Sequence, residues 1–327
     1  TMLASVWNAS GLTTILTAAL KEAIRRDERR LGLFICGGKG KTSRKTPDEI
    51  RNWGQVLSLP GPGVEKLVYN SRMAAKVDSS LIQDGFQIYH HSFFFSRNGA
   101  WAVVQQGMNT GNLTARRYHW FSKKITDLVC EPHSGIISQV RGNVLDLSAR
   151  ASQPTRDISV ELVRGGFQGL SRDISILRKH SSPLSQMVSL KSGEEQLTFL
   201  NLEDREFHRH PVLQEDFGPD KKSRYLDKIL TKVCDIKPKN YEQLLSLEGV
   251  GPKTMRALSL VSEVIYGAKP SYEDPARYSF AHGGKDGTPY EVDRKTYDAT
   301  IQFFTRLVQK MKVSPFEKNK ILTRLGR

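Results

Sequence analysis

The chain has 327 residues, of which 38% are apolar and 25% charged, a composition typical of a globular protein with two or three domains. No stretch approaches about 18 consecutive apolar residues, and the start of the chain lacks a signal-peptide pattern, so the sequence predicts neither a membrane span nor secretion. Lysine and arginine outnumber acidic residues by 49 to 34, and residues 221–327 hold 21 basic against 12 acidic side chains, which favours a polyanionic partner.

The first 150 residues predict an α/β or α+β domain. Residues 12–30 have helical spacing, and the apolar run 31–38 predicts a buried strand that two glycines stop. Thr46, followed by a proline and a glutamate at the third helical position, begins a capped helix. A further helix is expected near residues 64–82.

The clearest β signal covers residues 86–107. Two runs of aromatic and β-branched residues flank Asn98-Gly99, which is a preferred hairpin turn. Residues 114–121 predict a third strand. Most aromatic residues of these strands fit a sheet core, but those that face outward can stack on unpaired bases beside two basic residues of the third strand, Arg116 and Arg117.

A glycine-rich basic loop separates the first strand from the capped helix. The stretch "CGGKGKTSRKTP" (36–47) resembles a phosphate-binding P-loop, but the position that requires the first glycine holds Ile35. The alternatives are a solvated loop and a loop that holds a phosphate of DNA. In the second case the contacting side chains are Lys39, Lys41, Arg44 and Lys45.

Four histidines lie within 44 residues of one another, at positions 90, 91, 119 and 133. A metal-dependent nuclease using Mg²⁺ or Mn²⁺ needs such groups to converge. Adjacent histidines on a strand point to opposite faces, however, and no two of the four have the helical spacing of metal ligands. The sequence therefore predicts no metal site, and a nuclease remains an alternative reading of this domain.

Beyond the first domain the pattern is helical. Residues 151–220 predict a mostly helical connecting region that ends in a linker near 214–224. Residues 221–327 predict a compact all-α domain. The expected architecture is thus an α+β protein with an all-α C-terminal part.

The most informative stretch is "LEGVGPKT", Leu247–Thr254. Asn240 is the expected N-cap of a short helix that precedes this stretch, and Pro252 is expected in the first turn of the helix that follows. Between them lie Gly249, Val250 and Gly251, which allow a tight turn and close approach of a ligand. This pattern resembles the helix-hairpin-helix motif, in which backbone amides bind one DNA phosphate, and the alternative is an ordinary corner between two helices. The expected DNA-contacting residues of the turn are Gly249, Val250, Gly251, Lys253 and Thr254.

Together with "YEVDRKTYDATI" (290–301), this stretch resembles the helix-hairpin-helix DNA glycosylases of base-excision repair. In lyase members of that superfamily, a lysine after the hairpin attacks the sugar and an aspartate assists. The resemblance assigns these roles to Lys253 and Asp293. Asp293 also fits an ordinary helix cap, and Lys253 also fits a phosphate contact.

An unusual loop, "SFAHGGKDG" (279–287), precedes Asp293. If the resemblance to glycosylases holds, this loop is placed to shape a pocket for the base or to clamp the strand. The side chains of this loop that are expected to line such a pocket are those of His282, Lys285 and Asp286. The alternative is a surface turn.

The whole chain also resembles an uncharacterised family of archaeal and bacterial proteins with a domain of unknown function. The stretches that indicate this include "QDGFQIYHHSFFF", "WAVVQQGMNT" and "DPARYSFAHGGKDG". This resemblance implies a family for the full length of the chain but no chemistry.

These observations predict a DNA-binding protein of genome maintenance whose backbone contacts are largely independent of sequence. A glycosylase or AP lyase, which needs no cofactor, is the first hypothesis. A metal-dependent nuclease and a binding protein without chemistry are the alternatives. Three widely separated cysteines and no predicted membrane span indicate a reducing, cytoplasmic location near the nucleoid. The sequence does not predict the oligomeric state.

Overall fold

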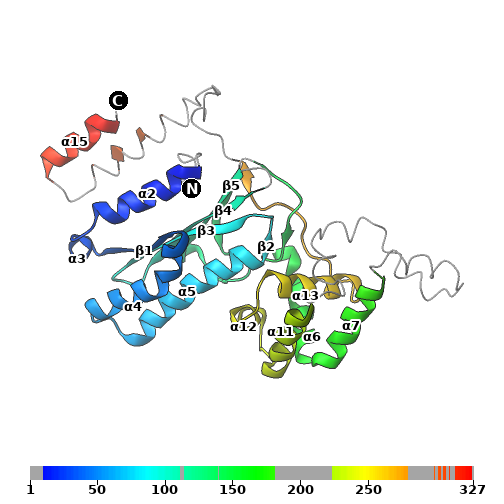
Figure 1. Cartoon of the computed structure of the whole chain (residues 1–327). Helices are drawn as coiled ribbons and strands as arrows, with labels where there is room; N and C mark the ends of the chain where they lie inside the picture. The colour runs from blue at the N-terminus through cyan, green and yellow to red at the C-terminus, as the bar shows by residue number, and fades with distance from the viewer. Residues whose placement is uncertain are drawn as a thin grey trace, which may run out of the picture.

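The computed structural model describes residues 10–110, 114–138, 140–180, 223–278 and 314–325, with a few single positions between 298 and 309. It shows a mixed α+β fold in which an N-terminal sheet with its helices is followed by a mostly helical part (Figure 1). This confirms the predicted α+β class. No helix among these residues is long and apolar enough to cross a bilayer.

Within the described residues, the main sheet has six strands in the order β1-β3-β4-β5-β6-β8. Neighbouring strands are antiparallel except β6 and β8, which are parallel. A second, two-stranded sheet joins β2 to β7. The strands are β1 (Leu33–Lys39), β2 (Ile82–Gln83), β3 (Gln87–Ser96), β4 (Trp101–Asn109), β5 (Thr114–Phe121), β6 (His133–Ser138), β7 (Leu145–Asp146) and β8 (Arg277–Tyr278).

The predicted hairpin and third strand are confirmed. Strands β3 and β4 are joined by a turn in which Gly99 has a left-handed φ of 80° and Ser96 N donates to Ala100 O. Strand β5 has the bounds that the sequence predicted, 114–121. The first predicted helix is divided at Arg26, whose left-handed φ of 76° separates a first helix from a short second one that Gly32, with φ 65°, ends before β1.

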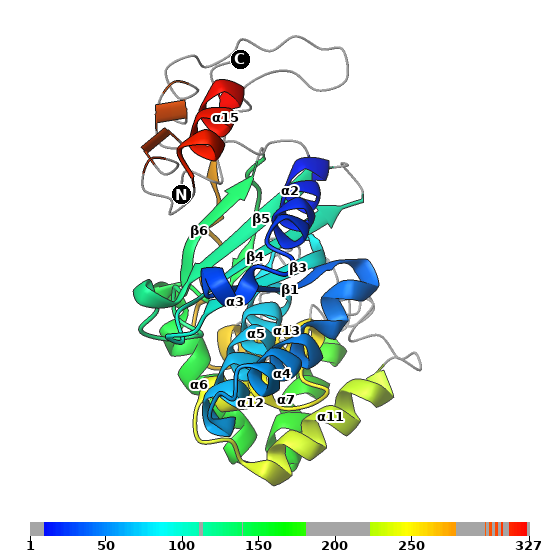
Figure 2. The ribbon, with the colours of Figure 1, turned by 90° about the vertical axis from the view of Figure 1, so that its left-hand side faces the viewer.

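The two faces of the sheet are covered differently. Helices α2 (Ser10–Ala23) and α3 (Glu28–Leu31) lie on one side of the sheet. Helices α4 (Thr46–Val56) and α5 (Gly61–Ser80) lie on the other side (Figures 1 and 2). Alternation places Phe93, Val103 and Trp120 in one cross-strand row of the face under α5, and all three are fully buried. The opposite face carries His90, which contacts Thr17 of α2.

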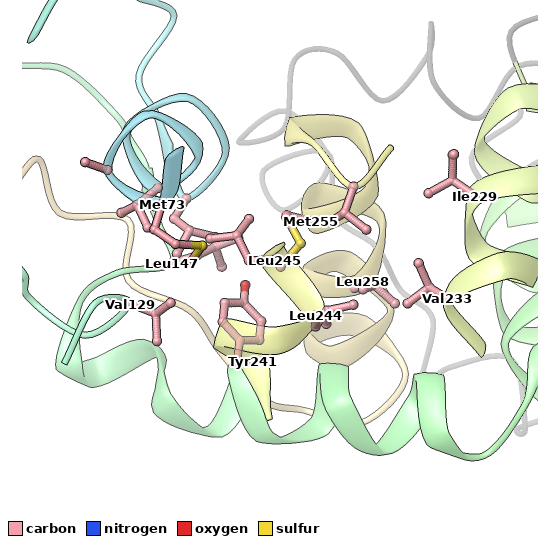
Figure 3. Close-up of a cluster of buried hydrophobic side chains, with 14 of the residues drawn as sticks. Met73, Val129, Leu147, Ile229, Val233, Tyr241, Leu244, Leu245, Met255 and Leu258 are labelled. Carbon is pink, nitrogen blue, oxygen red and sulfur yellow. The ribbon is translucent and has the colours of Figure 1, made fainter. Parts of the chain in front are cut away.

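The helical part consists of α6 (Gln153–Arg164), α7 (Phe167–His180), α11 (Ser223–Ile236), α12 (Tyr241–Ser246) and α13 (Pro252–Val264), and α15 (Pro315–Leu325) follows near the end of the chain. Its core is continuous with that of the sheet. Met73 of α5 and Leu147 lie beside Leu245 and Met255 in one buried hydrophobic cluster (Figure 3). Because of this shared core, the sheet and helices α6 to α13 hold one another in place.

Candidate nucleic-acid interface

Residues 240–264 form a short helix, a turn and a second helix, with the cap at Asn240 and the helix start at Pro252 that the sequence predicts. Asn240 Oδ1 accepts a hydrogen bond of 2.8 Å from Gln243 N and so caps α12. Gln243 Oε1 accepts a bond of 2.7 Å from Lys239 N, which satisfies a second backbone donor. Helix α12 therefore begins at Tyr241 and ends at Ser246, and α13 begins at Pro252.

Residues 247–251, called here the α12–α13 turn, depend on Gly249. Its φ of 87° lies in the left-handed region, and a Cβ at this position would overlap the Cδ1 of Ile229 on α11. Val250 is buried, 4% exposed, between the helices. Gly251 is different, since its φ of −151° is extended and a Cβ there would meet no atom within 4 Å. Gly249 is thus needed for the shape of the turn, and Gly251 leaves open space in front of it.

That open space is a recess of about 450 Å³ at the N-terminus of α13. Gly251 is half-buried, Lys253 is exposed and Thr254 is buried. The first turn of an α-helix has amide groups without acceptors inside the helix, and its dipole favours anions. The described residues that line the recess are Tyr225, Leu226, Gly249, Gly251, Pro252, Lys253 and Thr254.

The basic loop after β1 forms a six-residue 3₁₀ helix, η1 (Gly40–Lys45). Lys39, Lys41, Arg44 and Lys45 are all exposed. Gly37, just before this loop, has φ 85° and no room for a Cβ, because His91 O and Thr46 Oγ1 lie against it. The loop thus presents four cations on a firmly anchored backbone, and its contact with DNA stays a prediction.

Arg116 and Arg117 are buried, with 1% and 3% of their surface exposed. Arg116 donates to Asp84 Oδ2 at 3.0 Å and forms a double hydrogen bond to Asp274, with Nη2 at 2.7 Å from Oδ2. Tyr118 donates to the same Asp84 oxygen at 2.6 Å. The Arg116 guanidinium therefore joins two distant segments of the chain, and because both arginines are buried, neither faces outward to contact DNA as the sequence predicted.

The histidines considered as metal ligands lie in separate surroundings. His90 contacts Thr17 and Ser92, whereas His91 contacts Ser71 and Gln105, so the two neighbours face opposite sides of the sheet as predicted. In the part of the chain that the structure describes, no group of three or more histidine, cysteine, aspartate or glutamate side chains can hold a metal ion.

A buried carboxylate that the sequence analysis did not single out lies under the sheet. Asp78 of α5 is fully buried and accepts hydrogen bonds from three side chains on three strands. Trp120 Nε1 lies 3.1 Å from Oδ1, His133 Nε2 lies 2.5 Å from Oδ1, and Gln105 Nε2 contacts Oδ2. A signal was available, because Asp78 falls on the helical period of the buried Leu67, Ser71 and Ala74.

Asp293 and the loop residues His282, Lys285 and Asp286 lie outside the described residues. The structure therefore places Lys253 at the recess and says nothing of the groups that the glycosylase resemblance sets beside it.

The fold and this site define a class. The protein is a mixed α+β protein whose helical part has a glycine-containing turn and a lysine beside a recess at a helix N-terminus. The chain belongs to the family described as "Protein of unknown function (DUF763)", whose model matches residues 1–292. This confirms the predicted family of unknown function. No curated protein and no solved structure matches the chain.

Proposed function

We propose that this protein binds DNA in genome maintenance and that its α12–α13 turn holds one phosphate of the backbone. The observation that carries the proposal is the recess at the start of α13, where Gly251 leaves room for a ligand and Lys253 supplies a positive charge. A phosphate at this place meets backbone amides, the helix dipole and an ammonium group.

Several properties of the chain agree with a nucleic-acid partner. The formal net charge is +15, and the exposed cations of the basic loop add a second positive region. Contacts to phosphate position a protein on DNA without reading bases, so the binding proposed here is independent of sequence and weakens steeply with salt.

The resemblance to glycosylases extends the proposal to chemistry at Lys253. On an abasic deoxyribose, the neutral lysine amine adds to C1′ of the open-chain aldehyde, and loss of water leaves an imine that borohydride reduces to a stable amine. Lys253 is exposed in the recess, as this attack requires. Asp293 is the proposed assisting carboxylate.

The test of phosphate binding is Gly251→Val, compared with Gly169→Val at an exposed, open position of α7. Gly251→Val places a side chain in the recess at a position where an added Cβ meets no atom within 4 Å, so the protein is expected to stay folded with a modest N-cap cost. Its affinity for a fluorescent duplex is expected to fall about tenfold or more, the loss of roughly one charged hydrogen bond. Gly169→Val leaves the affinity unchanged. Wild-type affinity in folded Gly251→Val would overturn the proposal.

Borohydride trapping separates the chemical alternatives. Wild-type protein, incubated with an abasic duplex and borohydride, is expected to form a covalent adduct that Lys253→Ala abolishes. Cleavage that needs added Mg²⁺ or Mn²⁺ and survives Lys253→Ala would instead identify a nuclease. Salt-dependent binding without either reaction would identify a protein that only binds DNA.

A further inference from the structure

A lysine of the N-terminal half is bound by the α12–α13 turn. Lys76 lies on α5, and its Nζ donates to Leu245 O at 2.7 Å, to Leu247 O at 2.5 Å and to Val250 O at 3.3 Å. An ammonium group has three N–H bonds and no acceptor, so three carbonyls use its full capacity. The arrangement is a cation site built from the backbone of the turn and of the end of α12.

These contacts set the direction of the peptide groups in the turn. In a trans peptide the C=O of one residue and the N–H of the next point in opposite directions. Because Val250 O points to Lys76, the N–H of Gly251 points away from Lys76. Gly251 lines the recess proposed for the phosphate. The ammonium therefore fixes the orientation of the Gly251 amide, in a residue that lines the recess.

The N-terminal half holds the start of α13 by a second route. Gln83 of β2 donates from Nε2 to Pro252 O at 3.0 Å, and Gln83 Oε1 accepts from Arg256 Nε at 2.5 Å. Both the turn and the first residue of α13 are thus bonded to the segment 76–83, more than 160 residues away in sequence.

We propose that Lys76 is a positioning residue for phosphate binding and that its ammonium occupies a three-carbonyl cation site which sets the Gly251 amide toward the ligand. This inference rests on the proposed function. Backbone carbonyls that converge in this way can also replace the hydration shell of a monovalent metal ion. Removing the ammonium therefore opens the site to K⁺ from solution.

The experiment uses Lys76→Met, which keeps the aliphatic stem and removes the charge. In a buffer whose cation is N-methylglucamine, its affinity for duplex DNA is expected to fall about tenfold. Potassium at the same ionic strength restores most of that loss, whereas wild-type protein shows no such preference. Lys66→Met, on an exposed position of the same helix, removes the same charge and leaves affinity and cation response unchanged.

A second readout does not involve DNA. The thermal midpoint of Lys76→Met should rise when N-methylglucamine is replaced by potassium at constant ionic strength, and that of Lys66→Met should not. If Lys76→Met does not fold, Lys76→Gln, which keeps two donors, takes its place in both measurements.

Unchanged DNA affinity in a folded Lys76 variant, or equal response to potassium and N-methylglucamine, would overturn this inference. The phosphate proposal fails by a different result, namely full DNA affinity in Gly251→Val. The two failures are therefore distinguishable.

Discussion

The two glycines of the α12–α13 turn should respond to substitution to different extents. Placing alanine at 249 forces a side chain into a left-handed φ of 87°, which costs about 1–2 kcal/mol. The new Cβ also overlaps Ile229 Cδ1, and moving that methyl off its rotamer adds roughly 0.5–1.5 kcal/mol. Gly249→Ala should thus destabilise the protein by about 1.5–3.5 kcal/mol.

Gly251→Ala is the matched control. Its φ of −151° suits any residue, and no atom lies within 4 Å of the added Cβ. Gly251 is also the N-cap of α13, where alanine is clearly worse than glycine, so the expected cost is about 0.5–1 kcal/mol, still below that of Gly249→Ala.

A double-mutant cycle separates the two costs at Gly249. Ile229→Val removes the overlapping Cδ1, so Gly249→Ala in that background should cost about 1 kcal/mol less than in wild type, with the φ cost remaining. Urea titrations give the free energy of unfolding of wild type, of the two single variants and of the double variant. Equal costs for alanine at 249 and 251, or strict additivity with Ile229→Val, would refute the geometry described for the turn.

Two further predictions concern the sheet. Burial lowers the pKa of His90 to about 4 and, helped by nearby Arg117, that of His119 to about 3. In the unfolded state a histidine has a pKa near 6.5, so below that pH the unfolded state binds more protons than the folded state. The stability present above pH 6.5 is therefore lost as the pH falls toward 4. The loss is about 2 kcal/mol per histidine at pH 5. Urea titrations at pH 7 and 5 measure this, and a flat profile would contradict it. Asp78→Ala leaves the donors of Gln105, Trp120 and His133 buried without their acceptor and should cost about 3–5 kcal/mol, whereas a loss under 1 kcal/mol would show that the network contributes little.

Local patterns were sufficient for much of the fold. The turn residues Asn98-Gly99 placed the hairpin, and Asn240 with Pro252 placed both helices around the α12–α13 turn. Turn and cap preferences are set by the φ angles and hydrogen bonds of a few neighbouring residues, so the sequence alone determines them. The candidate site was found for the same reason.

The partners of polar side chains were decided only by the tertiary structure. Arg116 was expected to face DNA, but it lies 158 residues from Asp274, the carboxylate that holds it inside the fold. Lys76 lies 171 residues from Leu247, whose carbonyl it binds. Periodicity tells which residues share a face of one strand or helix, and it carries no information on which distant segment will cover that face. Whether a charged side chain meets solvent, a carboxylate or a turn is therefore settled only when the elements pack.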